Sequence, residues 1–117
     1  MDEPRRKGRA EVMDDICRMK AEMFKALGHP IRLRVVELVA DGEKSVTELV
    51  GAVGAEPSNM SRHLSVLKRA GIVSDRKEGL NVYYRLDLPC VANFFTCVTD
   101  AVKEKLERSE SLLEQLR

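Results

Sequence analysis

The segment that decides the fold reads PSNMSRHLSVLKRA and spans residues 57–70. Met60, Leu64 and Leu67 recur at the spacing of one helical face, which predicts a helix with a single apolar side. Pro57 suits the first position of that helix, where its missing N–H costs nothing. Small polar and basic residues occupy the other side. The segment therefore predicts a helix that packs on a core and presents a polar face to solvent.

A second short helix is expected directly upstream, at residues 45–54 (SVTELVGAVG). Ser45 or Thr47 is a suitable N-cap, and the apolar residues of the segment fall on one face. Two short helices joined by a tight turn are typical of a helix-turn-helix.

Downstream of the central helix the periodicity changes from helical to alternating. Ile72–Arg76 and Asn81–Leu86 are rich in β-branched and aromatic residues and flank a turn at residues 77–80. This pattern predicts a β-hairpin, or wing, over residues 72–86.

Three further helices are expected, over residues 10–27, from Pro30 to Asp41, and over residues 89–116. The first and last carry long apolar stripes, for which a lone domain would have little use. The predicted fold is thus mainly α with a small β-hairpin: a single winged helix-turn-helix domain over residues 10–117, after a flexible N-terminal arm at residues 1–9.

Composition limits the possible function classes. A chain of 117 residues with 44% hydrophobic and 33% charged residues suits one soluble domain. It has no stretch that could span a membrane and no apolar leader, so we expect a cytoplasmic protein. It also lacks a phosphate-binding glycine loop, an HExxH motif and a histidine suited to activate a cysteine, so we do not expect an enzyme.

The charge distribution indicates a polyanionic partner. The net charge is only +1, yet residues 58–85 hold six basic and two acidic residues. Arg62 has the donor geometry to read guanine and Asn59 to read adenine, while Lys77 suits a phosphate. His63 either contacts DNA or packs inside the protein. The residues expected at double-stranded DNA are Ser58, Asn59, Ser61, Arg62, His63, Lys68, Arg69, Arg76 and Lys77, the last two at the hairpin tip.

The stretch FKALGHPIRLRVVELVADGEKSVTELVGAVGAEPSNMSRHLSVLKRAGIVSDRKEGLNVYYRL, residues 24–86, resembles the ArsR/SmtB family of small bacterial winged-helix repressors. The most specific parts are LGHPIRLRVVELV, the S-x-M-S-R-H-L-x-x-L of the central helix, and V-x-x-R-K-E-G-x-x-x-x-Y-R-L in the wing. The resemblance implies a homodimer that binds operator DNA, represses transcription, and is released by an inducer. It also implies that the protein is dimeric through its first and last helices, residues 10–27 and 89–116, which agrees with their apolar stripes.

The cysteines depart from the sensing sites of that family. The Cys-x-Cys pair expected in the third helix is replaced by residues 46–50, and the histidines of the zinc site in the last helix are absent, although Cys90 falls where its first ligand in that helix would be. Cys90 and Cys97 are seven residues apart, about 10.5 Å along a helix, which is too far for a bridge within one chain. Antiparallel last helices of a dimer would bring these thiols together, with Cys17 as the third sulfur.

Three thiolates without histidine suit a soft inducer such as As(III), Pb(II) or Cd(II), bound by Cys17, Cys90 and Cys97. Two alternatives for the thiols stay open. In the first, the thiols sense persulfide or oxidants. In the second, the cysteines are small apolar packing residues. For the whole chain, the alternative is a winged-helix protein-interaction module that does not bind DNA.

Overall fold

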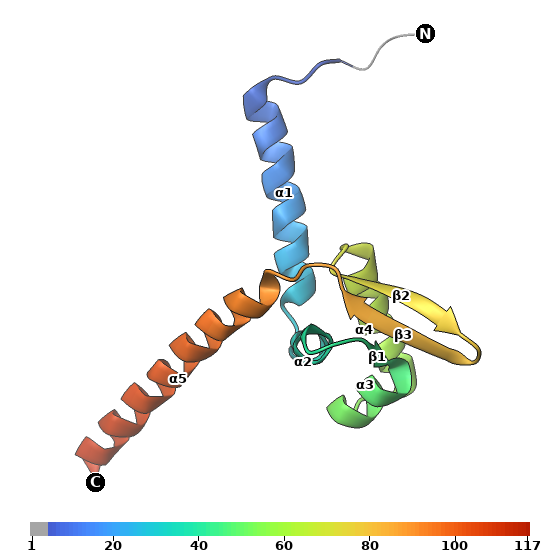
Figure 1. Ribbon diagram of the computed structural model, residues 1–117. Coiled ribbons are helices and arrows are strands. Elements are labelled where there is room, and N and C mark those ends of the chain that lie inside the picture. Colours follow the sequence, from blue (N-terminus) through green and yellow to red (C-terminus); the bar gives the residue numbers. More distant parts are fainter. Residues whose placement is uncertain (1–4) are drawn as a thin grey trace. The chain divides into compact units, whose positions relative to one another are not determined.

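The computed structural model describes residues 5–117, which fold into five helices and a small sheet (Figure 1). The elements are α1 (Arg9–Leu27), α2 (Pro30–Ala40), β1 (Lys44–Ser45), α3 (Val46–Val53), α4 (Pro57–Arg69), β2 (Val73–Glu78), β3 (Asn81–Leu86) and α5 (Val91–Leu116). The chain divides into two compact units, one ending at Asp87 and one running from Leu88 to Arg117. The predicted helices and wing are present, which confirms the mainly α, winged helix-turn-helix fold.

The core of the first unit forms around the apolar face of α4. Met60 and Leu67 are fully buried and Leu64 is nearly so, as their spacing predicted. Valines of α2, Leu49 of α3 and the start of β2 pack against the same interior. A helix of 13 residues is marginal by itself in water, so this packing is what holds α4 in place.

The sheet has a third strand that sequence reasoning missed. β1 pairs antiparallel with β3, in the order β1-β3-β2, with Lys44 opposite Tyr84 and Ser45 opposite Tyr83. Two residues are too few to show an alternating pattern, so the sequence gives no sign of this strand. It is defined only by its pairing with β3. Ser45 also caps α3: its hydroxyl accepts from Glu48 N–H at 3.1 Å, and Glu48 Oε1 accepts from Ser45 N–H at 3.2 Å.

The wing turn is tighter than predicted. β2 continues to Glu78, so only Gly79 and Leu80 connect the two strands. Gly79 has φ +62°, a conformation that glycine adopts without the steric cost of a side chain. Lys77 and Arg76 therefore lie within the strand, one and two pairing steps from its end, so the predicted turn at residues 77–80 is shorter than expected and Lys77 is not part of it.

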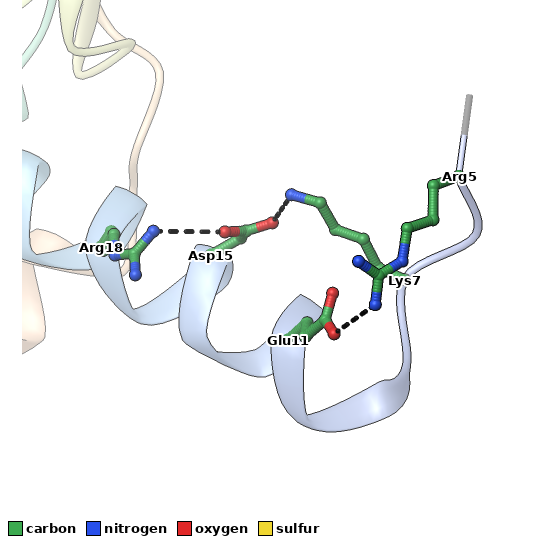
Figure 2. A network of polar contacts seen from close by, with 5 residues as sticks. All are labelled: Arg5, Lys7, Glu11, Asp15 and Arg18. Carbon is green, nitrogen blue, oxygen red and sulfur yellow. Dashed lines mark hydrogen bonds and ion pairs between the residues drawn. The ribbon is translucent and has the colours of Figure 1, made fainter.

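Basic residues before α1 pair with its acidic residues (Figure 2). Arg5 lies 3.5 Å from Glu11, while Lys7 pairs with Asp15, which also lies 3.6 Å from Arg18. These side chains are exposed, so the pairs contribute little to stability. Residues 1–4 of the expected flexible arm lie outside the described residues.

No helix within residues 5–117 combines the length and apolar character needed to cross a bilayer.

Replacing the buried Leu67 by alanine should lower the free energy of unfolding by about 2–5 kcal/mol, because it leaves a cavity under α4. Urea denaturation at one fixed protein concentration measures the change. Leu80→Ala is the matched control, since Leu80 is fully exposed in the wing turn and its loss should change stability by less than about 0.5 kcal/mol. Equal effects of the two substitutions would contradict the assigned core.

Candidate nucleic-acid interface

The outer face of α4 is polar, exposed and open at its N-terminal end. Ser58, Ser61 and Arg62 are exposed, opposite the buried leucines. The N-cap residue Glu56 makes no side-chain hydrogen bond to the helix end. The first-turn N–H groups of α4 are thus not occupied by a side-chain cap, which leaves them able to donate to an anion such as a phosphate.

Arg62 and Asn59, the two residues with base-reading chemistry, are hydrogen-bonded to each other. Arg62 Nη2 donates to Asn59 Oδ1 over 2.6 Å, one turn apart on the helix. A guanidinium has five N–H donors, so most of them stay available to a ligand. The bond limits the rotamers of both side chains and places the two groups as one unit on the outer face of α4.

His63 lies inside the protein and not on the outer face. Its side chain is only 9% exposed and its Nδ1 lies 3.2 Å from Arg32 Nη1. Its ring also packs against His29, with 4.3 Å between centroids. Of the two interpretations of His63, the structure favours packing, and we leave it out of the proposed DNA contacts.

Arg76 is held by groups of its own sheet and the preceding loop. Its Nη2 lies 2.5 Å from Glu43 Oε1, its Nη1 lies 2.6 Å from Glu78 Oε2, and its guanidinium sits 4.6 Å from the centre of the Tyr83 ring. Hydrogen bonds to Glu43 and Glu78 raise the pKa of Arg76 above its ordinary value. Its charge is therefore already balanced, and a phosphate would have to compete with two carboxylates.

Strand alternation separates the two basic residues of the wing. Successive side chains of a strand point to opposite faces, so Lys77 shares a face with Val73 and Asp75, and Arg76 takes the other. Asp75 forms an ion pair with Lys68 of α4, 2.9 Å apart, so the face that carries Lys77 is the one toward α4. Within residues 5–117, Lys77 has no ion-pair partner, which makes it the available cation of the wing.

Of the two basic residues at the end of α4, one is also held by a carboxylate and the other is not. The hydrogen bond and charge of Asp75 raise the pKa of Lys68, and this ion pair ties α4 to the wing. Arg69 is exposed and donates only to the Ser65 carbonyl, at 3.4 Å. Arg69 is the freer of the two to reach a DNA backbone.

The three cysteines are free and exposed in the single chain. Cys17 lies on α1, Cys97 lies on α5, and Cys90 is the N-cap residue of α5. Among residues 5–117, no cluster of three or more His, Cys, Asp or Glu side chains is placed to hold a metal ion. A metal site made of these thiols would therefore need cysteines from a second copy of the chain.

Sequence reasoning missed the groups that hold the predicted site residues. Glu43, Asp75 and Glu78 restrain two of the expected cations, and Arg32 holds His63. Strand alternation would have separated Arg76 from Lys77, once the strand end was known. No sequence pattern could have predicted the pairing of Arg76 with Glu43, because the two residues are far apart in the chain and meet only when the loop before β1 lies next to the sheet.

Comparisons with known proteins agree with this geometry. The family described as "Bacterial regulatory protein, arsR family" matches residues 29–75. The uncharacterized HTH-type transcriptional regulator Rv0081 of Mycobacterium tuberculosis is 37% identical over 105 residues, covering 89% of this chain and 92% of its own. Its crystal structure superposes with a TM-score of 0.69, covering 80% of this chain and 95% of that one.

Two further relatives are informative. The "transcriptional repressor SmtB homolog" of Synechocystis sp. is 37% identical over 95 residues, covering 80% of this chain and 72% of its own. The homodimeric winged helix-turn-helix DNA-binding domain Mb0332 of Mycobacterium bovis, described as a possible ArsR-family regulator, is 33% identical. Its TM-score is 0.69, and the match covers 88% of this chain and 93% of that one.

Asp75→Asn should strengthen binding to duplex DNA, because it releases Lys68 in the last turn of α4 from its ion pair. The slope of log Kobs against log salt should become steeper by about one, the signature of one more phosphate contact. Fluorescence anisotropy with a labelled duplex between 50 and 200 mM salt measures it. Asp100→Asn on α5 removes the same charge without releasing Lys68 and should leave the slope unchanged; equal slopes for both variants would refute the role assigned to Asp75.

Proposed function

Because this chain belongs to the ArsR family of bacterial regulatory proteins, which are DNA-binding transcriptional regulators, we propose that it is a homodimeric repressor. It reads double-stranded operator DNA through α4 and is released when an inducer reacts with its cysteines. The observation that carries the DNA-reading role is the polarity of α4, whose inner face is core and whose outer face presents Ser58, Ser61 and the bonded Arg62–Asn59 pair.

The proposed contacts divide into base-reading and backbone groups. Arg62 and Asn59 suit base edges in the major groove, while Ser58, Ser61 and the helix N-terminus suit phosphates close to the helix. The remaining backbone cations are Arg69 and Lys77, with Lys68 and Arg76 available only when they leave their carboxylates.

Exposed apolar stripes support the homodimer. On α1, Val12, Met13, Ile16 and Met19 are between 37% and 69% exposed, although they follow helical spacing. On α5, Val98, Val102, Leu106 and Leu113 are between 43% and 60% exposed in the same way. Apolar stripes of this length in water favour burial against a second copy, and the Mb0332 domain named above is homodimeric.

The proposed inducer is a thiophilic metalloid or metal, with arsenite as the leading candidate. The three thiols are free, and they lie on α1 and α5 or at the start of α5, the helices that we assign to the dimer interface. Sulfur ligands without imidazole favour As(III), Pb(II) or Cd(II). Since one chain by itself offers no metal cluster within the described residues, the site we propose combines Cys17, Cys90 and Cys97 of the dimer.

A persulfide or oxidant is the second candidate, and one observation favours it. The thiols are free and exposed, and a sulfur bridge between chains needs only two of them. In either case, the inducer would favour a dimer whose recognition helices no longer match major grooves about 34 Å apart. A coupling of about 1–3 kcal/mol is enough for roughly 5- to 150-fold release.

Arg62→Ala should weaken binding by about 1–3 kcal/mol and relax the preference for bases at one position, because it removes a base-reading fork. Lys77→Ala should weaken binding to all sequences alike and reduce the salt slope by about one. Selection of duplexes from a random pool, followed by anisotropy, measures both. Lys105→Ala on α5 is the charge-matched control. If Arg62→Ala retains the wild-type preference, α4 does not read the bases.

Arsenite should release the reduced wild-type protein from its selected duplex, and replacing Cys17, Cys90 and Cys97 by serine should abolish the release. Gel shift with arsenite, Cd(II) and a persulfide donor in separate lanes distinguishes the inducers. A response to the persulfide donor alone would replace the metalloid by sulfur chemistry. Release of the triple-serine variant by any of the three would show that the cysteines are not the sensor.

A further inference from the structure

The only two histidines of the chain meet in one cluster inside the first unit. His29 is the N-cap of α2, and its Nδ1 accepts from Ile31 N–H at 3.1 Å. His63 lies in the middle of α4, and the two ring centroids are 4.3 Å apart. The cluster therefore joins the start of α2 to the buried side of the recognition helix.

Arg32 connects this cluster to the end of α1. Its Nε donates to the carbonyl of Ala26 at 2.5 Å, its Nη2 donates to the carbonyl of Lys25 at 3.5 Å, and its Nη1 lies 3.2 Å from His63 Nδ1. One guanidinium thus bonds both the last turn of α1 and the middle of α4. This bridge lies between the helix that carries an apolar stripe and the helix that carries the polar reading face.

The chemistry of this bridge determines the protonation state of His63. Arginine donates hydrogen bonds and cannot accept them, so Nδ1 of His63 has to be the acceptor. The imidazole is therefore neutral and carries its proton on Nε2. A protonated ring would place an N–H against the N–H of Arg32 and two positive charges 3.2 Å apart.

We infer that Arg32 and His63 are positioning residues for DNA binding: a neutral His63 holds α4 against the end of α1, and a proton on His63 loosens the recognition helix. The inference rests on the proposed role of α4 in reading DNA. It adds a proton as a second input, at a place that contains none of the three cysteines.

The surroundings of His63 oppose its protonation. Burial lowers the pKa of His63 below its ordinary value of 6.5, and the nearby His29, Arg32 and Arg62 lower it further. The other elements packed on α4 supply no compensating charge within the described residues, since Glu48 of α3 bonds Ser45 and Asp75 of β2 bonds Lys68.

The sign of the pH dependence follows from the lowered pKa. The folded protein takes up a proton at His63 less readily than the unfolded chain does. Its stabilising contribution is therefore complete above about pH 6.5 and decreases as the pH falls through that value toward the folded pKa.

The first test uses the free protein and does not depend on DNA. Nitrogen-15 NMR of the imidazole rings at pH 7.5 should show His63 with its proton on Nε2, and a titration should place its pKa below 6.5. Arg32→Met should shift the Nδ1 resonance, because it removes the donor. A proton on Nδ1, or a protonated ring at pH 7.5, would overturn the inference.

The second test measures the pH profile of DNA binding, with a duplex selected from a random pool by the wild-type protein at pH 7.5. Between pH 7.5 and 5.5 affinity should fall severalfold and by less than about tenfold, because the pKa of His63 lies below 6.5 and only part of the free protein carries the proton at pH 5.5. His63→Asn keeps an amide oxygen near the position of Nδ1 but cannot titrate, so its profile should be flat. His29→Asn keeps His63 and should retain the fall. Circular dichroism at each pH checks that every variant is folded.

The outcomes separate the two proposals. Affinity that rises toward pH 5.5 in the wild type would mean that a charged His63 only attracts DNA, and would overturn the positioning role. A flat wild-type profile would do the same. If the pool yields no preferred duplex at pH 7.5, the DNA-reading role fails, while the NMR tautomer still decides whether the Arg32–His63 bond exists.

Discussion

Burial of the inner face of α4 is the constraint on which the rest of the structure depends. The side chains of Met60, Leu64 and Leu67 are all removed from water. Burial of each one stabilises the folded state by about 1.5–3 kcal/mol. A 13-residue helix would not persist alone, so the outer face acquires a fixed direction only because the inner one is packed. The hydrogen-bonded Arg62–Asn59 pair is thus presented on a helix whose direction is fixed, which is what the proposed base-reading role requires.

Some of the basic residues in and near the wing form ion pairs within the protein, and only the others are available to a partner. Arg76 ties the sheet to Glu43 and Glu78, and Lys68 ties α4 to Asp75. These exposed pairs contribute little stability, yet they hold cations that would otherwise attract any polyanion. The protein therefore meets a duplex with fewer available cations than its sequence suggests. In the proposed complex, a larger share of binding then has to come from the polar face of α4, which we propose reads the bases.

One side chain makes hydrogen bonds to both α1 and α4. Arg32 bonds the carbonyl of Ala26 at the end of α1 and His63 in α4. A change at either end of this bridge is transmitted to the other through a hydrogen bond with a defined donor and acceptor. Such a bond has two states, made and broken, which is the property that a switch between binding and release needs.

Much of the fold and part of the site followed from the amino-acid order. Apolar spacing and end signals are local, so the helices, the buried leucines of α4 and the exposure of Arg62 could be predicted from neighbours within a few residues. The strand β1, the partners of Arg76 and Lys68, and the burial of His63 depend on residues far apart in sequence. Lys44 pairs with Tyr84, and Arg32 with His63, only after the helices have packed. Local periodicity therefore determined the apolar face of α4 and most of its outward polar residues, while tertiary packing buried His63 and decided which of the outward charges are free to meet another molecule.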